Sequence, residues 1–258
     1  MAQLPRARQR PGEYINSPPQ YPGPGDAGAA SVLLLYRNRN AIRIAVPLFF
    51  VSRPPMPSLA DIRRRLADRQ PCPMMIGSRR HAAVAMILRD AAHGPEILFI
   101  ERARHESDPW SGDLGFPGGK IEANDDEPRR AAERETLEEI GFDLQRACYL
   151  GRLDDLAGAH LPVVISCFVY ETGKADNFTL SEEVAEVFWV PLRTLADPRR
   201  HRLTTVFFRG ERLQRPAIDL RGPDRTVLWG ITYRLICQFL QILGLEPGRC
   251  EADAGLSG

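Results

Sequence analysis

The feature that most constrains this chain is a glycine turn followed by an acidic segment, residues 115–142, GFPGGKIEANDDEPRRAAERETLEEIGF. Glu135, Glu138 and Glu139 fall within five residues, and on a helix they occupy one arc of about 100°. Like charges three and four residues apart destabilise a helix by roughly a few tenths of a kcal/mol per pair. The opposite side of the helix is apolar enough to pack on a sheet. A fold containing this helix must bury that side and give the glutamates an electrostatic partner.

Two interpretations of the acidic side compete. A solvated helix face is the commonest explanation of a charge run, but it predicts lysines four residues after the glutamates, and there are none. The alternative is a site for a hard cation, because clustered carboxylates repel one another until Mg²⁺ or Mn²⁺ neutralises them. Gly118 and Gly119 suit such a site, since glycine lets the backbone approach a ligand closely. Arg134 is expected to hold one of the carboxylates in position.

Residues 119–142 resemble the Nudix box, whose pattern is G-x5-E-x7-R-E-U-x-E-E-x-G-U, where U is a bulky apolar residue. The matching positions are Gly119, Arg134, Glu135, Glu138, Glu139, Gly141 and Phe142. The departures are Asp125 in the first glutamate position, one extra residue before the Arg-Glu pair, and Thr136 in place of the first U. The resemblance covers about residues 58–244. It implies an α/β fold, a Nudix-type α/β/α sandwich around a mixed β-sheet.

The resemblance implies an enzyme of the Nudix hydrolase family, which uses Mg²⁺ or Mn²⁺ to cleave the diphosphate bond of nucleoside-diphosphate-linked compounds. By position, Glu135 and Glu139 would be the principal metal ligands, with Glu138 and the Gly119 carbonyl assisting. The general base would be Glu135 itself or a carboxylate from a later loop, for which Glu183 is the candidate. A solvated loop acid explains Glu183 equally well.

Within the family, FPGG at 116–119, Asp125 and the extra residue resemble the coenzyme A diphosphatase branch, as does VLWGITYRLI at 227–236. Typical members of that branch carry an upstream signature that ends in H-x-G-Q-V-x-F-P-G-G. Its His, Gln and Val places are taken here by Trp110, Asp113 and Leu114. Asp108 also replaces an arginine of the branch. These departures remove a basic group that would meet the 3′-phosphate of coenzyme A.

Substrate contacts are predicted for four residues at and before the glycine turn: Arg102, Arg104, Trp110 and Phe116. The arginines would reach phosphates and Trp110 would stack on a base, although a surface arginine and a packing tryptophan are the simpler explanations. Three functions stay open. They are a coenzyme A or acyl-coenzyme A diphosphatase, a diphosphatase for ADP-ribose or another nucleotide, and a non-catalytic Nudix sensor that binds nucleotide. The intact glutamates argue against the sensor, while the missing arginine and histidine keep the second function open.

Composition divides the chain near Ser58. Residues 1–57 hold ten of the 22 prolines and seven arginines against two acids, a net charge of +5, and predict a disordered extension. Either Met56 is the true start, or this extension is a transit peptide. Residues 58–244 are predicted to form the Nudix domain, and residues 245–258 a disordered tail.

Apolar periodicity gives the expected elements of the domain. Helices are predicted at 58–69, between Pro128 and Gly141, and at 226–244. Strands are predicted at 82–88, 96–103, 148–154, 163–171, 184–192, 203–208 and 216–220. No parallel βαβ repeat is evident, so this interleaving predicts a mixed sheet between helices.

Charge and cysteine usage narrow the partners. The chain after residue 57 has 27 basic and 31 acidic residues, which argues against a nucleic-acid-binding face. No apolar run approaches the ~20 residues of a membrane span. The five cysteines lie far apart without a C-x-x-C motif, which predicts a reducing compartment, and the protein is expected to be cytoplasmic. The expected partner is a small-molecule nucleotide substrate, and a homodimer stays open.

Overall fold

The computed structural model describes residues 55–105, 110–159, 161–173, 177–222 and 225–246, together with the backbone of residues 32–33 and 47–48. By its contacts the chain divides into two units, residues 1–53 and 54–258. In the first unit β1 (Val32–Leu33) pairs antiparallel with β2 (Pro47–Leu48). The predictions of a disordered extension and of a disordered tail fall largely outside the described residues.

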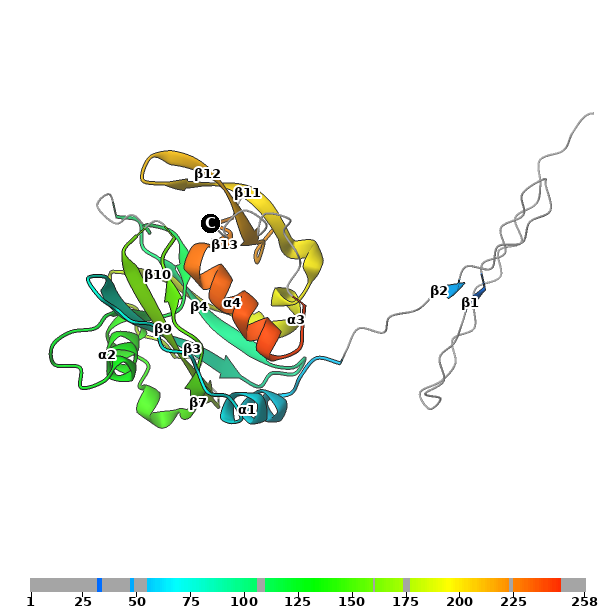
Figure 1. Ribbon diagram of the computed structural model, residues 1–258, viewed down its shortest axis with the longest axis horizontal. Coiled ribbons are helices and arrows are strands. Elements are labelled where there is room, and N and C mark those ends of the chain that lie inside the picture. The colour runs from blue at the N-terminus through cyan, green and yellow to red at the C-terminus, as the bar shows by residue number, and fades with distance from the viewer. Residues whose placement is uncertain are drawn as a thin grey trace, which may run out of the picture. The chain divides into compact units, whose positions relative to one another are not determined.

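A mixed sheet forms the centre of the second unit (Figure 1). Its strand order is β10-β4-β3-β9-β7, and the short strands β5, β6 and β8 pair with β4, β3 and β9. Only β3 and β9 run parallel among these pairs, in register from Arg80 opposite Val163 to Arg89 opposite Thr172. The bounds are β3 (Arg80–Arg89), β4 (Glu96–Arg102), β5 (Leu114–Gly115), β6 (Gly118–Lys120), β7 (Cys148–Arg152), β8 (Leu156–Ala157), β9 (Val163–Thr172) and β10 (Val184–Pro191). The predicted mixed sheet is confirmed.

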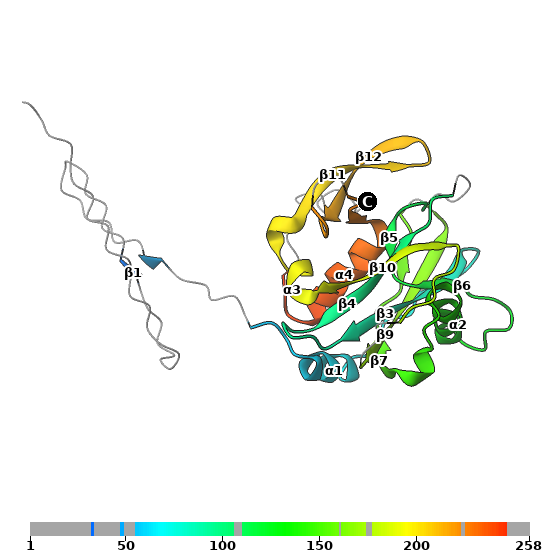
Figure 2. The same cartoon turned by 180° about the vertical axis from the view of Figure 1, so that it is seen from behind.

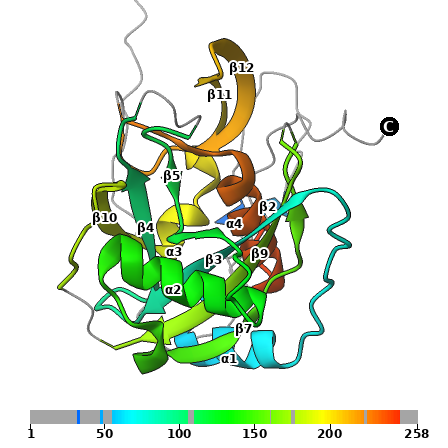
Figure 3. The same ribbon diagram turned by 90° about the vertical axis from the view of Figure 1, so that its left-hand side faces the viewer.

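Helices cover both faces of this sheet. Successive side chains of a strand point to opposite faces, so Ala85 and Ile87 of β3 join one apolar cluster, and Met86 and Leu88 join the other. Figure 3 shows α2 lying across the first face, with α4 behind the sheet. The helices are α1 (Leu59–Ala67), α2 (Pro128–Ile140), α3 (Leu192–Leu195) and α4 (Gly230–Ile242). Apolar residues of α1 and α4 fill the second cluster, which confirms the α/β/α sandwich.

The ends of α1 and α2 follow from their sequences. The Ser58 hydroxyl accepts the N–H of Asp61, and the Asp61 carboxylate accepts the N–H of Ser58, so a reciprocal capping box starts α1. Pro128 opens α2, where its missing N–H has no intrahelical partner to lose. The helix ends at Gly141, as the sequence predicts.

A small second sheet lies beyond the central one, with β11 (His201–Phe208), β12 (Glu211–Ile218) and β13 (Leu228–Trp229). The strand predicted at 216–220 was placed too late, because β12 already begins at Glu211. The two-residue turn Arg209-Gly210, with φ of 53° and 83°, joins it directly to β11. Figure 2 shows this hairpin extending away from the central sheet.

The closing helix α4 begins at Gly230, four residues later than predicted. Leu228 and Trp229 instead pair with Ile218 and Ala217 of β12, which takes them out of the helix. Beyond α4, Leu245 is still buried in the core. Among the described residues, no helix has the length and apolar character to cross a membrane.

Candidate metal and diphosphate site

The glycine turn lies directly against the acidic helix. Gly119 of β6 faces Glu135 so closely that a Cβ at this position would collide with all three atoms of the carboxylate. Gly118 has a φ of 145°, and a Cβ there would collide with the carbonyl oxygen of Ala83. Position 118 therefore requires glycine for its backbone conformation and its backbone neighbour, whereas glycine at 119 leaves room for the close approach of the Glu135 side chain.

Glu139 is fixed on the same turn, at the neighbouring glycine. The N–H of Gly118 donates to Glu139 Oε2 at 2.8 Å, and the residue is only 4% exposed. Its second oxygen, Oε1, faces Arg102. The two glycines thus place Glu135 and Glu139, four residues apart on α2, against a single backbone turn.

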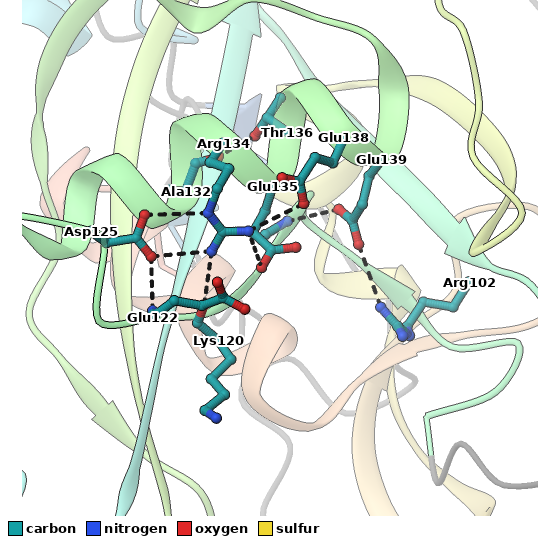
Figure 4. A network of polar contacts seen from close by, with 11 residues as sticks. Arg102, Lys120, Glu122, Asp125, Ala132, Arg134, Glu135, Thr136, Glu138 and Glu139 are labelled. Atoms are coloured by element: carbon teal, nitrogen blue, oxygen red, sulfur yellow. Dashed lines mark hydrogen bonds and ion pairs between the residues drawn. The ribbon is translucent and has the colours of Figure 1, made fainter.

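Arg134 holds the acidic end of α2 together (Figure 4). Its guanidinium donates to both oxygens of Asp125, at 3.3 and 3.1 Å, and to the carbonyl of Lys120 at 3.2 Å. The same group donates to Glu135 at 3.0 Å and to Glu138 at 3.2 Å. Hydrogen bonding to Arg134 lowers the pKa of Asp125, and hydrogen bonding to Asp125 raises the pKa of Arg134. Asp125 has a shorter side chain than the glutamate of the Nudix box, and one extra residue separates it from Arg134. Its carboxylate nevertheless accepts hydrogen bonds from Arg134.

The site is short of positive charge. Burial raises the pKa of Glu139 to about 7, with further increases from the charges of Glu135 and Glu183; Gly118 and Arg102 act in the opposite direction. Burial also raises the pKa of Glu135, against the hydrogen bond from Arg134. Two partly desolvated carboxylates therefore face each other with incomplete neutralisation.

Arg102, at the end of β4, connects Glu139 to Glu183. Its Nη1 lies 3.6 Å from Glu139 Oε1, and its Nη2 lies 3.9 Å from Glu183 Oε2. The backbone brings Glu183 here, because its carbonyl accepts the N–H of Ala103 at 2.8 Å. The Glu183 side chain is 70% exposed. Both are site residues predicted from the sequence, but the sequence does not predict that they meet.

The donor set fits a hard divalent cation. Within the described residues, no three His, Cys, Asp or Glu side chains surround one point as they stand, and Glu138, with its side chain 58% exposed, is held by Arg134. Glu135 and Glu139 nevertheless present their carboxylates to adjacent glycines of one turn, and burial raises both pKa values, with further increases from neighbouring glutamates. Oxygen ligands of this kind suit Mg²⁺ or Mn²⁺.

The residues predicted for substrate contact do not share one environment. Arg104 is exposed, and Trp110 is 37% exposed at the start of the loop before β5. Phe116 needs a correction: it is 5% exposed and stacks on Phe99, with ring centroids 5.1 Å apart. It supports the turn from the core and presents no face to a ligand.

Two contacts in this region were not predicted from the sequence. The indole N–H of Trp229 donates to Asp113 Oδ1 at 2.8 Å, which ties the loop before β5 to the start of α4. Thr136, in the place of a bulky apolar residue, is fully buried and donates its hydroxyl to the carbonyl of Ala132 at 2.6 Å. The intrahelical bond explains how a threonine fits that place. No sequence signal links Asp113 to Trp229.

Residues 79–208 match the family model of the NUDIX domain, half of the chain, and the chain belongs to this family. The predicted Nudix family is thereby confirmed. Among its relatives is the "Mitochondrial coenzyme A diphosphatase NUDT8" of Homo sapiens, 32% identical over 181 residues, which are 68% of this chain and 74% of that protein.

Two further similarities complete the comparison. The "Uncharacterized protein C14C4.10c" of Schizosaccharomyces pombe is 35% identical over 112 residues, and the match spans 40% of this chain but about a third, 34%, of that protein. Among solved structures, a MutT/nudix family protein from Enterococcus faecalis is 18% identical, with a TM-score of 0.44 over 74% of this chain and 76% of that chain.

Proposed function

We propose that the protein is a Mg²⁺- or Mn²⁺-dependent hydrolase that cleaves the diphosphate bond of a nucleoside-diphosphate-linked substrate, with coenzyme A or an acyl-coenzyme A as the first candidate. One observation carries the proposal. Glu135 and Glu139, both with raised pKa values, approach the adjacent residues Gly119 and Gly118 of one turn, and Gly118 has a backbone conformation that favours glycine. A solvated acidic face would leave such carboxylates in water.

In this proposal Glu135 and Glu139 bind the cation, with Glu138 and the Gly119 carbonyl assisting. A cation held there would neutralise charge on the diphosphate and activate the attacking water. A water oxygen attacks one phosphorus and the bridging P–O bond breaks, so the leaving phosphate keeps the electron pair. Glu183 or Glu135 takes the proton of the water. Arg134 keeps Glu135 and Glu138 oriented through its own bonds to Asp125.

Substrate binding falls to the β4–β5 loop. Arg102 and Arg104 supply positive charge for the diphosphate, and Trp110 offers a partly exposed ring for a base. One finding supports coenzyme A as the candidate: the chain is 32% identical to a human relative that is named as a coenzyme A diphosphatase.

The test is a panel of diphosphates offered to the purified full chain with Mg²⁺ and with Mn²⁺, with product masses read out. Coenzyme A should give 3′,5′-ADP and 4′-phosphopantetheine, and the Glu139→Gln variant should give neither. Cleavage of ADP-ribose or a dinucleotide in preference to coenzyme A would replace the substrate and keep the chemistry. Tight nucleotide binding without any cleavage would instead identify a sensor and contradict the proposed hydrolase.

A further inference from the structure

Glu139 uses its two carboxylate oxygens differently. Oε2 accepts a hydrogen bond of 2.8 Å from the Gly118 N–H, which fixes the carboxylate on the backbone. Oε1 faces the guanidinium of Arg102 at 3.6 Å, an ion pair at more than hydrogen-bond length. Oε1 is therefore the oxygen left for a cation, and it is the oxygen that Arg102 now faces (Figure 4).

Arg102 and Arg134 hold their glutamates with different strength, although their side chains are similarly exposed, 27% and 29%. Arg134 donates hydrogen bonds of 3.0–3.3 Å to three carboxylates and a backbone carbonyl. Arg102 reaches Glu139 and Glu183 only at 3.6 and 3.9 Å. Arg134 is therefore held by hydrogen bonds, whereas the longer contacts of Arg102 with Glu139 and Glu183 are the ones that cation binding can break.

In the metal-free protein, the buried Glu139 needs a positively charged group at the position that Arg102 occupies. Glu139 is 4% exposed, and a buried carboxylate without a compensating charge is strongly destabilising. Once a divalent cation binds Oε1, that need ends, and a guanidinium so close to the cation becomes unfavourable because like charges repel. The same guanidinium then lies beside the place where an anionic diphosphate must bind.

We propose that Arg102 is an exchangeable counter-ion: it neutralises Glu139 and Glu183 in the metal-free protein, leaves Glu139 when the divalent cation binds, and then binds the substrate diphosphate. This inference rests on the proposed function. It assigns Arg102 a positioning role before substrate arrives and a binding role afterwards. It also makes the binding of cation and anion mutually favourable, because a contact with one site is released by occupation of the other.

The test measures stability and Mn²⁺ affinity without any turnover. Wild type and Arg102→Gln are melted with and without saturating Mn²⁺ at pH 8.5, and Mn²⁺ binding is measured by calorimetry. We expect Arg102→Gln to lower the Tm of the metal-free protein by about 3–5 °C. With Mn²⁺ its Tm should match wild type within about 1 °C, and its Mn²⁺ affinity should rise at least about fivefold. Arg102→Lys, which keeps one charge, should fall between the two proteins.

Arg89→Gln is the matched control. Arg89 is also an arginine at a strand end, with a side chain 23% exposed and paired with Glu96 at 2.8 Å. Glu96 is the first residue of β4, so this pair lies at the opposite end of that strand from Arg102. The Arg89→Gln variant should change Tm equally with and without Mn²⁺ and leave Mn²⁺ affinity unaltered.

An equal Tm loss for Arg102→Gln in both states, or an unchanged or weaker Mn²⁺ affinity, would overturn the exchange. Wild-type protein that binds no Mn²⁺ would overturn it together with the metal site. Failure of the exchange and failure of the function are distinguishable. If the diphosphate panel shows hydrolysis but Arg102→Gln does not change Mn²⁺ binding, the proposed function is supported and the exchange is contradicted. If the Tm values follow the expected pattern but no diphosphate is hydrolysed, the exchange is supported and the proposed function is contradicted.

Discussion

Two regions of the site differ in how far apart their contacting residues lie along the chain: the network around Arg134 and the β4–β5 loop. Lys120, Asp125, Glu135 and Glu138, which close on Arg134, all lie between residues 120 and 138. Asp113 of the loop is bonded to Trp229, which is 116 residues away. At the end of β4, Glu101 is paired with Arg221, which is 120 residues away. The network around Arg134 is therefore local in sequence, whereas the part that should recognise the substrate depends on the C-terminal third of the domain.

The largest expected effect comes from the local part. Glu139→Gln keeps an acceptor for the Gly118 N–H but removes the charge, and we expect kcat to fall about 10³-fold, several kcal/mol of lost stabilisation. Tm should stay equal or rise, because a buried charge is removed. Steady-state kinetics and a melt measure both. Glu138→Gln is the comparison: its exposed side chain predicts a loss of about tenfold or less. Equal losses in the two variants would contradict the assignment of Glu139 as a principal ligand.

The metal-free protein should lose stability as pH rises through neutrality. The folded-state pKa of Glu139, about 7, exceeds its ordinary value of 4.5, so the folded state binds more protons between these values. The contribution is complete below pH 4.5 and is lost as pH rises through 7, roughly 3 kcal/mol in all. Denaturant unfolding with chelator from pH 5 to 8 measures it. In Glu139→Gln most of this decrease should vanish, leaving the part that the raised pKa of Glu135 contributes, and a decrease of full size would locate its cause elsewhere.

Gly119→Ala tests the turn itself. The new Cβ must displace the Glu135 carboxylate, so we expect kcat to fall about 10²-fold and stability to fall by about 1–3 kcal/mol. Gly173→Ala, which meets nothing within 4 Å, is the control and should be close to neutral in both measurements. An active Gly119→Ala enzyme would show that Glu135 has room to move without losing its role.

The distant support of the loop should show as a smaller effect of another kind. Trp229→Phe removes the hydrogen bond to Asp113 and should cost about 1 kcal/mol of stability. We expect KM to rise severalfold with kcat nearly unchanged, because the loop and not the metal site is loosened. Trp189→Phe is the control, since within the described part of the chain the Trp189 indole nitrogen has no hydrogen-bond partner. A fall in kcat for Trp229→Phe would mean that the two regions are not independent.

The smallest effect concerns the 3′-phosphate. Asp108 and Trp110 stand where the coenzyme A branch has Arg and His, so kcat/KM for coenzyme A and dephospho-coenzyme A should differ by less than about threefold. A strong preference for the phosphorylated form would point to Arg102 or Arg104 as the group that recognises it.

The sandwich was predictable from the sequence, and the metal site stays a prediction, because the information for both is close together along the chain. Alternating apolar runs define β3, β4 and β9, and Glu135 and Glu139 need only one helix and one adjoining turn. Boundaries failed where pairing overrode local preference. The start of α4 was placed at 226 because Leu228 and Trp229 fit an amphipathic helix, yet β12 takes them into a sheet.

Contacts between distant segments could not be predicted. Nothing in the sequence says that Glu183 would approach Arg102, or that Phe116 would stack on Phe99 and not face a ligand. Both outcomes depend on how β10 and β5 pair with β4, which is a matter of register. The identity of a chemical group was readable from the sequence, but the partner it meets was not.

The central claim is that Glu135 and Glu139, set against the Gly118–Gly119 turn, bind the catalytic cation. An anomalous difference map from crystals of the full chain grown with Mn²⁺ tests it most directly. The account predicts a peak within coordination distance of Glu135 and of Glu139 Oε1, with Arg102 moved away from Glu139. A map with no peak at this turn, or with Arg102 still paired to Glu139 beside a metal bound elsewhere, would contradict it.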